Sequence, residues 1–493
     1  MNCLLRGAFC VLTAVLLTGC VTSSPATKIA QRRKGAPPSQ PNRSRKPKTA
    51  PSEAHEQASR RPGLMPESHD TSAGRLPRGF RPESAAPPTA PLPLRRALSL
   101  ALGRNPKLQA FDQGIRAAEA RIVEAGLWSN PELELEVDEV GGTGELAGTD
   151  AAEFSVRLAQ TFPLGGDRRS RRDLAKYQAR FADREYEVVR TQILTDVTQR
   201  FVQALAAQRN LAVAEQELDL AQEIQTAVKK RVEAGTSAEI EQVRARVPVA
   251  KAEVQVQQWK RRLATAHRQL ALSWGSRKPR FTAVTGDLED LTKPPSPDVL
   301  ASLISRNPQV AQWAVKASIH RAEEDLARAT AVPDLTAGIG MKRFNESDET
   351  AFLIGISLPL PLFDRNLGDR QAARAEANAA EFRTREAELR LEHQLSSAWT
   401  QLANAYEEAV MLRKRALPAA REAFNVTRRA FENGDVDFID VLDAERTLVA
   451  LHTRHVTALV EHHTAAADIE GLIGRSLDDL SAEKSGNKTE ELE

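Results

Sequence analysis

The sequence predicts a mainly α-helical fold built from a duplicated repeat, in which each repeat adds two membrane strands to long, coiled-coil-like helices. One observation is that segment 98–106 returns as segment 300–308, and both copies end in Arg-Asn-Pro. Another is that the same elements follow each copy: a helix, two alternating strands, a very long helix, a glycine turn and a shorter helix. A period of about 200 residues is too long for a solenoid, so we interpret it as one fold duplicated within the chain.

The N-terminus has the pattern of a secretory signal. Arg6 precedes the apolar run 8–17, which is too short for a permanent membrane helix, so we expect residues 1–19 to be a signal peptide. Residues 17–20, Leu-Thr-Gly-Cys, resemble the bacterial lipobox. That resemblance implies cleavage before Cys20 and attachment of acyl chains, palmitate among them, to Cys20. An ordinary secretory signal with a chance cysteine is the alternative.

The residue after Cys20 and the other cysteines extend this interpretation. Val21 stands where an Asp would retain a lipoprotein at the inner membrane, so the resemblance implies the outer membrane. Cys3 and Cys10 leave with the signal peptide, and the mature chain then has no disulfide, thiolate nucleophile or Cys-based metal site.

Residues 20–93 differ in composition from the rest of the chain. They contain 14 prolines and 13 Lys and Arg against 5 Asp and Glu, without apolar periodicity. Such a segment cannot bury enough apolar surface to offset its ordering entropy, so we expect a disordered tether. It is either a passive spacer or a basic arm whose clusters at 32–34 and 43–48 contact phosphate-bearing polymers. Residues 475–493 predict a second polar segment, the C-terminal tail.

Four segments alternate apolar and polar residues in the manner of strands with two different faces: 132–138, 154–160, 335–341 and 352–358. A soluble, half-buried sheet would show the same alternation. Strands of about 9 to 11 residues suit a tilted crossing of a bilayer, and the lipoprotein signal favours that reading. We expect the polar connections 140–151 and 342–350 to face outside.

A sheet in a membrane has to close on itself, because unpaired backbone groups in hydrocarbon cost several kcal/mol each. Four strands are fewer than the eight of the smallest barrels, so several chains must contribute to one barrel. With the aliphatic faces toward lipid, acidic residues of the first strand face the lumen and favour cations, and Arg157 offsets part of their field. These acids are Glu132, Glu134, Glu136 and Asp138.

The helices are too long for an ordinary globular domain. Residues 167–233 predict one helix of about 100 Å, which ends at a Gly-Thr-Ser turn before a returning helix to about residue 274. The second copy predicts a helix over 366–432, a turn at 433–435 and a last helix to about residue 473. Pro248 and Pro418 predict bends. The repeats then cover 94–274 and 298–474, joined by an equatorial linker, 275–297.

The order of these elements resembles the TolC-type outer membrane efflux proteins, from about residue 94 to 474. The repeated Arg-Asn-Pro, the Phe-Pro-Leu-Gly-Gly-Asp-Arg step at 162–168 and the Gly-Asp-Val-Asp-Phe-Ile-Asp-Val-Leu-Asp-Ala stretch at 434–444 carry this resemblance. It implies a homotrimer with one twelve-stranded barrel above an α-helical periplasmic tunnel. It also implies docking of the helix-turn tips, at Gly235 and Gly434, onto a periplasmic adaptor that serves an inner-membrane RND-type pump. The Gly-Gly-Asp-Arg step and the acidic first strand are most similar to the lipoprotein branch that exports heavy metals.

The resemblance also implies a narrow periplasmic entrance lined by aspartates, here Asp440 and Asp443. Like carboxylates around a threefold axis attract cations and resist closure. A basic residue that locks the closed state in relatives is replaced here by Val436, and the first copy has Glu241 and Arg244 at the equivalent places. Solvated acids after a helix N-terminus are the alternative.

Four histidines near the C-terminus, two of them one helical turn apart, raise the hypothesis of a metal site. They are His452, His455, His462 and His463. No cysteine joins them, and adjacent residues point in different directions on a helix, so we expect ordinary polar positions rather than metal ligands. No phosphate loop, HExxH or Gly-x-Ser-x-Gly motif occurs, so we expect no enzyme activity, no cofactor and no nucleic-acid partner.

The predicted function is that of a passive outer membrane exit duct in a tripartite efflux system, with heavy-metal cations as the expected cargo. Within the same class, the alternatives are a duct for drugs or for type I secretion of polypeptides. A different class remains possible on the sequence alone: a lipid-anchored coiled-coil scaffold without a pore.

Overall fold

The computed structural model describes residues 91–480, which lie within one compact unit of the chain. The predicted signal peptide, Cys20, nearly all of the tether and the last part of the tail, 481–493, lie outside the described residues. The first repeat, including the short strand β4 in the linker that follows it, contains these elements: β1 (Leu92–Pro93), α1 (Leu94–Arg104), α2 (Pro106–Ala125), β2 (Glu132–Asp138), β3 (Glu153–Phe162), α3 (Asp167–Glu233), α4 (Glu239–Leu272) and β4 (Val284–Thr285).

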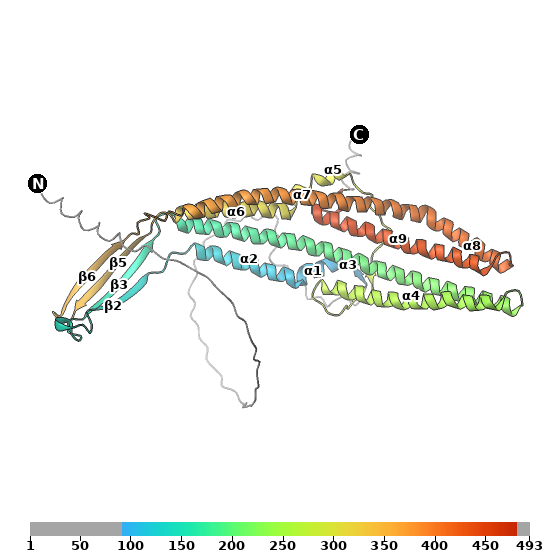
Figure 1. Cartoon of the computed structure of the whole chain (residues 1–493), viewed down its shortest axis with the longest axis horizontal. Coiled ribbons are helices and arrows are strands. Elements are labelled where there is room, and N and C mark those ends of the chain that lie inside the picture. Colours follow the sequence, from blue (N-terminus) through green and yellow to red (C-terminus); the bar gives the residue numbers. More distant parts are fainter. Residues whose placement is uncertain (1–90, 481–493) are drawn as a thin grey trace, which may run out of the picture. The chain divides into compact units, whose positions relative to one another are not determined.

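The second repeat has the same order, which confirms the predicted duplicated and mainly α-helical fold (Figure 1). Its elements are α5 (Pro297–Ala301), α6 (Pro308–Ala329), β5 (Leu335–Phe344), β6 (Glu349–Ser357), α7 (Leu367–Met411), α8 (Leu417–Asn433) and α9 (Phe438–Ile473). Helix α3 spans 67 residues between the predicted bounds, 167 and 233.

The repeated Arg-Asn-Pro has the same structural job in both copies. The Asn105 side chain accepts a hydrogen bond from the amide of Lys107 at 2.8 Å, and Asn307 accepts one from Gln309 at the same distance, so each asparagine caps a helix that starts with proline. Each side-chain amide also donates to a carbonyl at the end of the returning helix, at Ser273 and Leu472. The motif therefore joins α2 to α4 and α6 to α9.

The contacts between helices define the order in which they pack in the layer. Along its length α3 packs against α2 and then α4, while α7 packs against α6 and α8 against α9 (Figure 1). The two repeats meet because α3 also contacts α6 and α9. The helices α2, α4, α7 and α8 thus form the two outer edges of the packed layer, and α3 lies inside it with α6 and α9.

The second long helix is interrupted beside Pro418, where the sequence predicted a bend. A π-helical turn, Leu412–Ala416, separates α7 from α8, and Pro418 is the second residue of α8. The reason is that proline has no amide hydrogen and its ring clashes with the carbonyl of the preceding turn, so the local register widens. Pro248, by contrast, lies inside α4, which continues through it.

The four longer strands form one antiparallel sheet with the order β2-β3-β5-β6, so the two repeats join through β3 and β5. The strands of the second repeat are longer than predicted. Pairing continues to Phe344 opposite Glu349, which leaves only residues 345–348 as the connection and brings Lys342 into β5. The prediction that 342–350 is a connecting segment was therefore wrong, because cross-strand hydrogen bonds extend the sheet beyond the region of clear alternation.

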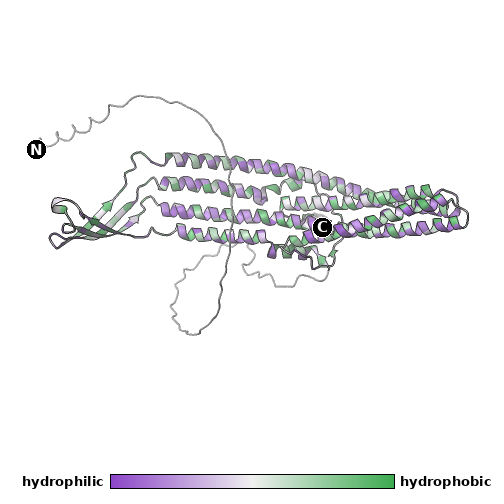
Figure 2. Ribbon diagram, turned by 60° about the horizontal axis from the view of Figure 1, so that its bottom comes forward, coloured by the Kyte–Doolittle hydropathy of each residue, from purple (hydrophilic) through white to green (hydrophobic). Residues whose placement is uncertain are grey.

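Hydrophobic residues are found on the strands and along all the helices, where they alternate with hydrophilic ones (Figure 2). Between residues 91 and 480, no helix combines the length and the apolar character needed to cross a membrane.

Candidate functional site

The four-stranded sheet has one continuous apolar face. Apolar residues are direct cross-strand partners from one edge to the other: Leu135 pairs with Val156, Val156 with Met341, and Met341 with Phe352. The large apolar side chains of this face are exposed in the single chain, with exposed fractions from 47% for Phe154 to 84% for Ile354. They are Leu133, Leu135, Val137, Phe154, Val156, Leu158, Ile339, Met341, Phe352, Ile354 and Ile356. Exposed apolar surface on this scale marks a face that meets lipid or a partner.

The opposite face carries the charged residues predicted for the lumen. Glu132, Glu134, Glu136 and Asp138 alternate along β2, and Arg157 of β3 lies directly opposite Glu134. The Arg157 guanidinium is 3.4 Å from the Glu134 carboxylate. The structure therefore brings these two predicted residues together, in an ion pair whose side chains are both exposed and that contributes little stability.

A second cation on this face was missed in the sequence. The Lys342 ammonium lies 3.5 Å from the Asp138 carboxylate and contacts Glu153 as well, so it bridges β2 and β3 from its place on β5. The sequence contained a signal for this position: Lys342 follows Gly338 and Gly340 at the two-residue spacing that places all three on the same face of β5. The polar face thus carries acids with two interspersed cations.

The predicted tip glycines both adopt left-handed backbone conformations. Gly235, after α3, has φ of 73°, and Gly434, after α8, has φ of 90°. In this region a side chain is strained, so glycine lets each long helix stop and the chain reverse. A hydrophobic cluster that includes Val228, Phe431 and Phe438 underlies both turns.

Arg231 ties the two tips together, a contact that sequence reasoning did not identify. Its guanidinium lies 4.4 Å from the centre of the Phe431 ring and donates a hydrogen bond to the Phe431 carbonyl. It also reaches the carbonyl of Thr236 at 3.5 Å. One side chain therefore holds the end of α3, the turn after it and the end of α8.

Replacing Arg231 with alanine should loosen both tips, because the cation–π contact and the hydrogen bonds are lost together, at a cost of about 1–2 kcal/mol. Hydrogen exchange followed by mass spectrometry should show faster exchange over 231–240 and 430–440. Lys230→Ala is the control, since it removes the same charge from an exposed neighbouring position. Equal exchange in the two variants would contradict the role of Arg231.

The residues predicted to line an entrance lie just beyond these turns but do not all meet within one chain. Asp440 accepts a hydrogen bond from the amide of Asp437 at 3.3 Å and so helps to cap α9, while Asp443 is exposed one turn later. Glu241 accepts a hydrogen bond from Ser237. Arg244 is exposed and makes no ion pair with any residue of 91–480, so a single chain does not join it to the aspartates.

The four histidines of α9 form two separate environments. His462 Nε2 is 3.0 Å from the carbonyl of Thr292, and His463 Nε2 is 3.0 Å from that of Leu288. Because a carbonyl only accepts, both rings donate, and they fasten the segment 288–292 to α9. These two imidazoles are occupied in packing the linker.

The other two histidines line a pocket beside the π-helical turn. Four arginines and two glutamates, Glu289 and Glu422, share this pocket with His452 and His455, so its charged lining is net positive and disfavours a cation. The arginines are Arg209, Arg413, Arg421 and Arg429, and His455 Nε2 lies 3.4 Å from the Glu289 carboxylate. Burial and the positive charges of Arg421 and Arg209 hold the pKa of His452 below its ordinary value. The arrangement favours polar packing over metal ligation.

The buried His462 should make stability depend on pH. Burial holds its pKa below the ordinary value in the folded protein, although the Thr292 carbonyl acts in the opposite direction. Below about pH 6.5 the unfolded chain therefore binds a proton that the folded chain resists, and stability falls by up to about 1.4 kcal/mol per pH unit. His462→Gln keeps a donor but does not titrate, so it should lose less stability than the wild type between pH 7.5 and 5.5.

Thermal unfolding followed by circular dichroism tests this difference. Buried acids such as Glu445 and Glu470 have raised pKa values because of burial, and they stabilise the fold as pH falls. The comparison between wild type and variant cancels their contribution. Parallel pH profiles would show that His462 does not titrate differently in the two states.

Comparisons with known proteins agree with this architecture. The model of the family described as outer membrane efflux protein matches residues 97–276 and 299–475. The cobalt-zinc-cadmium resistance protein CzcC of Cupriavidus metallidurans is 32% identical over 406 residues, which cover 82% of this chain and 94% of CzcC. The pyoverdine export outer membrane protein OpmQ of Pseudomonas putida is 25% identical, over 72% of this chain and 80% of OpmQ.

A solved structure supports the fold independently. The outer membrane protein VceC of Vibrio cholerae superposes with a TM-score of 0.62 at 17% identity, over 78% of this chain and 96% of VceC. Outer membrane efflux channels work with an adaptor and an inner-membrane pump. The matches confirm the predicted family, the efflux function and the outer membrane location, and the chain belongs to the outer membrane efflux protein family.

Proposed function

We propose that three copies of this chain close one twelve-stranded barrel in the outer membrane and continue it as a helical tunnel in the periplasm, a passive duct for metal cations. The observation that carries the proposal is a sheet of only four strands with a continuous apolar face. Its outer strands, β2 and β6, each pair on one side only among residues 91–480. In hydrocarbon these edges need partners, and further copies supply them.

The edges of the helical layer support the same assembly. Helix α4 exposes a row of aliphatic residues, Ile240, Val243, Val247 and Val254, and α7 on the opposite edge exposes Phe382 and Leu389. When copies are arranged around an axis, the α2 and α4 edge of one chain meets the α7 and α8 edge of the next. Such contacts bury these side chains and stabilise the closed ring.

Aromatic residues mark where the strands give way to helices. Trp128, four residues before β2, and Phe162, the last residue of β3, lie together with ring centroids 6.5 Å apart, and Arg168 stacks on Trp128 at 4.5 Å. In the second repeat Phe363, between β6 and α7, is 99% exposed. Aromatic belts of this kind occur at membrane–water interfaces, so this level fits the inner surface of the membrane.

The remaining parts of the duct follow from the chain's ends and tips. Lipidated Cys20 anchors each copy to the outer membrane through the tether 20–93, and the efflux repeats comprise 94–274 and 298–474. The tips at Gly235 and Gly434 dock on the periplasmic adaptor, which connects the duct to an RND-type pump. Asp440 and Asp443, with Glu241 nearby, ring the entrance when three copies meet.

The proposed cargo is a divalent metal cation such as zinc, cobalt or cadmium. Support comes from the extensive similarity to CzcC, whose name refers to cobalt, zinc and cadmium, and from the acidic β2 strand on the polar face. A second candidate is export of a small organic molecule, because OpmQ is named for pyoverdine export. The pore-free scaffold is less favoured, because a coiled-coil rod does not account for the exposed apolar face of the sheet.

Planar-bilayer conductance of the purified full chain tests the duct, and native mass spectrometry tests the number of copies. We expect a mass of three chains and a cation-selective current. A monomer without current would overturn the duct.

For cargo, a deletion strain should become sensitive to zinc, cobalt or cadmium and recover with the wild-type gene. Sensitivity limited to antibiotics or to iron starvation would replace the metal with an organic cargo.

A further inference from the structure

A histidine and two glutamates from neighbouring helices converge between α6 and α7. His320 and Glu323 lie one turn apart on α6, and Glu376 approaches from α7. The His320 Nδ1 atom is 2.7 Å from Glu323 Oε2 and 3.1 Å from Glu376 Oε2. The His320 side chain is only 13% exposed, whereas Glu376 is 61% exposed and open to solvent. These three ligand atoms all lie within 4.8 Å of one another.

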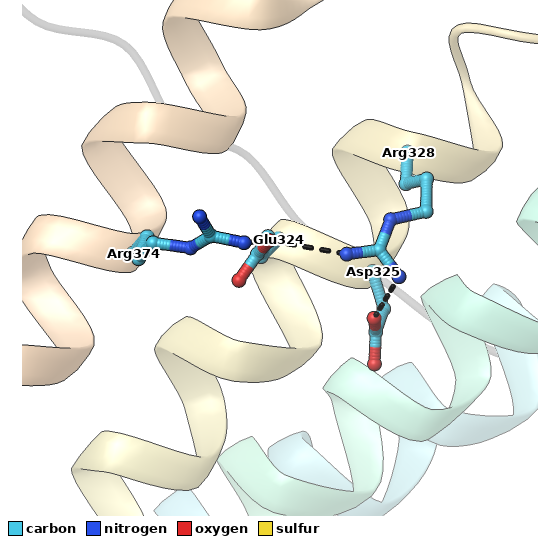
Figure 3. A network of polar contacts seen from close by, with 4 residues as sticks. All are labelled: Glu324, Asp325, Arg328 and Arg374. Carbon is cyan, nitrogen blue, oxygen red and sulfur yellow. Dashed lines mark hydrogen bonds and ion pairs between the residues drawn. The ribbon is translucent and has the colours of Figure 1, made fainter.

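The charges around this cluster single it out. Glu324, the next residue along α6, is bound by Arg328 at 3.1 Å and by Arg374 at 3.0 Å (Figure 3). Further along, Glu381 of α7 pairs with Arg321 of α6. The neighbouring acids that join these helices are thus neutralised by arginines.

The two acids at His320 have no such partner. Within residues 91–480, neither Glu323 nor Glu376 makes an ion pair with a lysine or arginine. Both carboxylates meet the same ring nitrogen, which carries at most one proton and so donates fully to only one of them. Two carboxylates thus share one imidazole nitrogen, and a divalent cation provides the positive charge that they lack.

We propose that His320, Glu323 and Glu376 bind a divalent transition-metal cation such as Zn²⁺ or Co²⁺ and thereby clamp α6 to α7. Imidazole nitrogen and carboxylate oxygen suit such ions, and the absence of sulfur disfavours Cu⁺. Around tetrahedral Zn²⁺ ligand atoms lie about 3.4 Å apart. The distances from His320 Nδ1 to Glu323 and Glu376 would therefore widen by about 0.7 and 0.3 Å. Three protein ligands leave one position for water.

The location gives the clamp a structural meaning. His320 lies nine residues before the end of α6, and Glu376 nine residues after the start of α7. Both are therefore about 14 Å from the helix ends that lead to β5 and β6. Both helices carry buried alanines near this level, among them Ala317, Ala373 and Ala377. A metal here fixes two helices at the base of the sheet, whether or not metal ions are the exported cargo.

Isothermal titration calorimetry of the full chain, purified in detergent without a histidine tag and freed of metal by chelation, tests the site with Zn²⁺, Co²⁺ and Mg²⁺. We expect one Zn²⁺ or Co²⁺ per chain and no binding of Mg²⁺. His320→Gln and Glu376→Gln should weaken Zn²⁺ binding at least about tenfold. Glu381→Gln is the matched control, because it removes the same charge from the same helix pair and should bind as the wild type does.

Thermal unfolding provides a second readout that separates loss of the site from loss of the fold. Without metal, all variants should unfold near the wild-type temperature. Zn²⁺ should raise this temperature for the wild type and Glu381→Gln, and should raise it less for Glu376→Gln. Unchanged Zn²⁺ affinity in His320→Gln and Glu376→Gln, or no stoichiometric binding to the wild type, would overturn the site. Zinc sensitivity of a deletion strain tests the cargo separately and leaves this result unaffected.

Discussion

Replacing Ile354 with lysine should prevent the chain from assembling in the outer membrane. Ile354 lies near the middle of β6, its side chain is 84% exposed on the apolar face, and its cross-strand partner is Ile339. A lysine near the bilayer midplane destabilises a membrane barrel by about 2–4 kcal/mol. In a barrel of three copies this cost arises three times, which is comparable to the whole stability of an ordinary domain.

The adjacent residue offers a matched control. Leu353 belongs to the polar face, in the cross-strand row that contains Gly340, Arg157 and Glu134. Leu353→Lys adds the same charge to the same strand, but on the polar face, which lines the lumen in the proposed barrel. We expect this variant to assemble and to carry a current with weaker selectivity for cations.

Membrane fractionation and native electrophoresis distinguish the two variants. Ile354→Lys should be missing from the outer membrane fraction or degraded, and Leu353→Lys should be found there as an oligomer. If the two lysines have the same effect, or if Leu353→Lys is the one that fails, the faces of the sheet have been assigned in the wrong sense.

The elements that the sequence predicted well are those defined by local periodicity. Helix α3 begins and ends at its predicted bounds because a glycine precedes it and another follows it, with no glycine or proline between 167 and 233. The alternation in β2 and β3 likewise predicted which residues share a face. In these segments the local pattern and the tertiary contacts agree, so the sequence is sufficient.

Other features depend on partners that are distant in the sequence. Lys342 was assigned to the connection between strands. Pairing with β3 and β6 decides where β5 ends, and the residues next to Lys342 in the sequence do not reveal this pairing. Arg231 looks like an ordinary basic residue at a helix C-terminus until Phe431, 200 residues later, is placed beside it. In the sequence His320 and Glu323 resemble part of a solvated helix face, because Glu376, which completes the cluster, lies on α7. No window of sequence contains both sides of such contacts.

The histidines of α9 show the opposite difficulty. Their spacing suggests one cluster, but spacing along a helix does not indicate what each side chain faces. The linker covers His462 and His463 with carbonyl groups, and four arginines and two glutamates line the pocket that holds His452 and His455. The environment is supplied by α3, α7, α8 and residues 288–292, which a search for motifs along α9 does not consider.

Replacing Gly165 with alanine should destabilise the junction between sheet and helices more than its size suggests. A Cβ atom at this position would lie 2.0 Å from the carbonyl oxygen of Ala329, at the end of α6, and 2.9 Å from the Cβ of Val332. The oxygen belongs to the backbone, so the end of α6 has to move away from the start of α3. Overpacking of this kind costs about 1–3 kcal/mol, and a rigid backbone neighbour favours the upper end.

Gly165→Ala should also impair assembly of the pore. The reason is that the β3–α3 connection of the first repeat meets the α6–β5 connection of the second repeat at Gly165. Gly368→Ala is the control: Gly368 lies in the first turn of α7, and a Cβ there meets nothing within 4 Å. We expect Gly165→Ala to unfold at a lower temperature by circular dichroism and to yield fewer assembled oligomers, whereas Gly368→Ala should match or slightly exceed the wild type. Equal stability of the two variants would mean that α6 shifts without cost, and that the close approach at Gly165 does not hold the two repeats together.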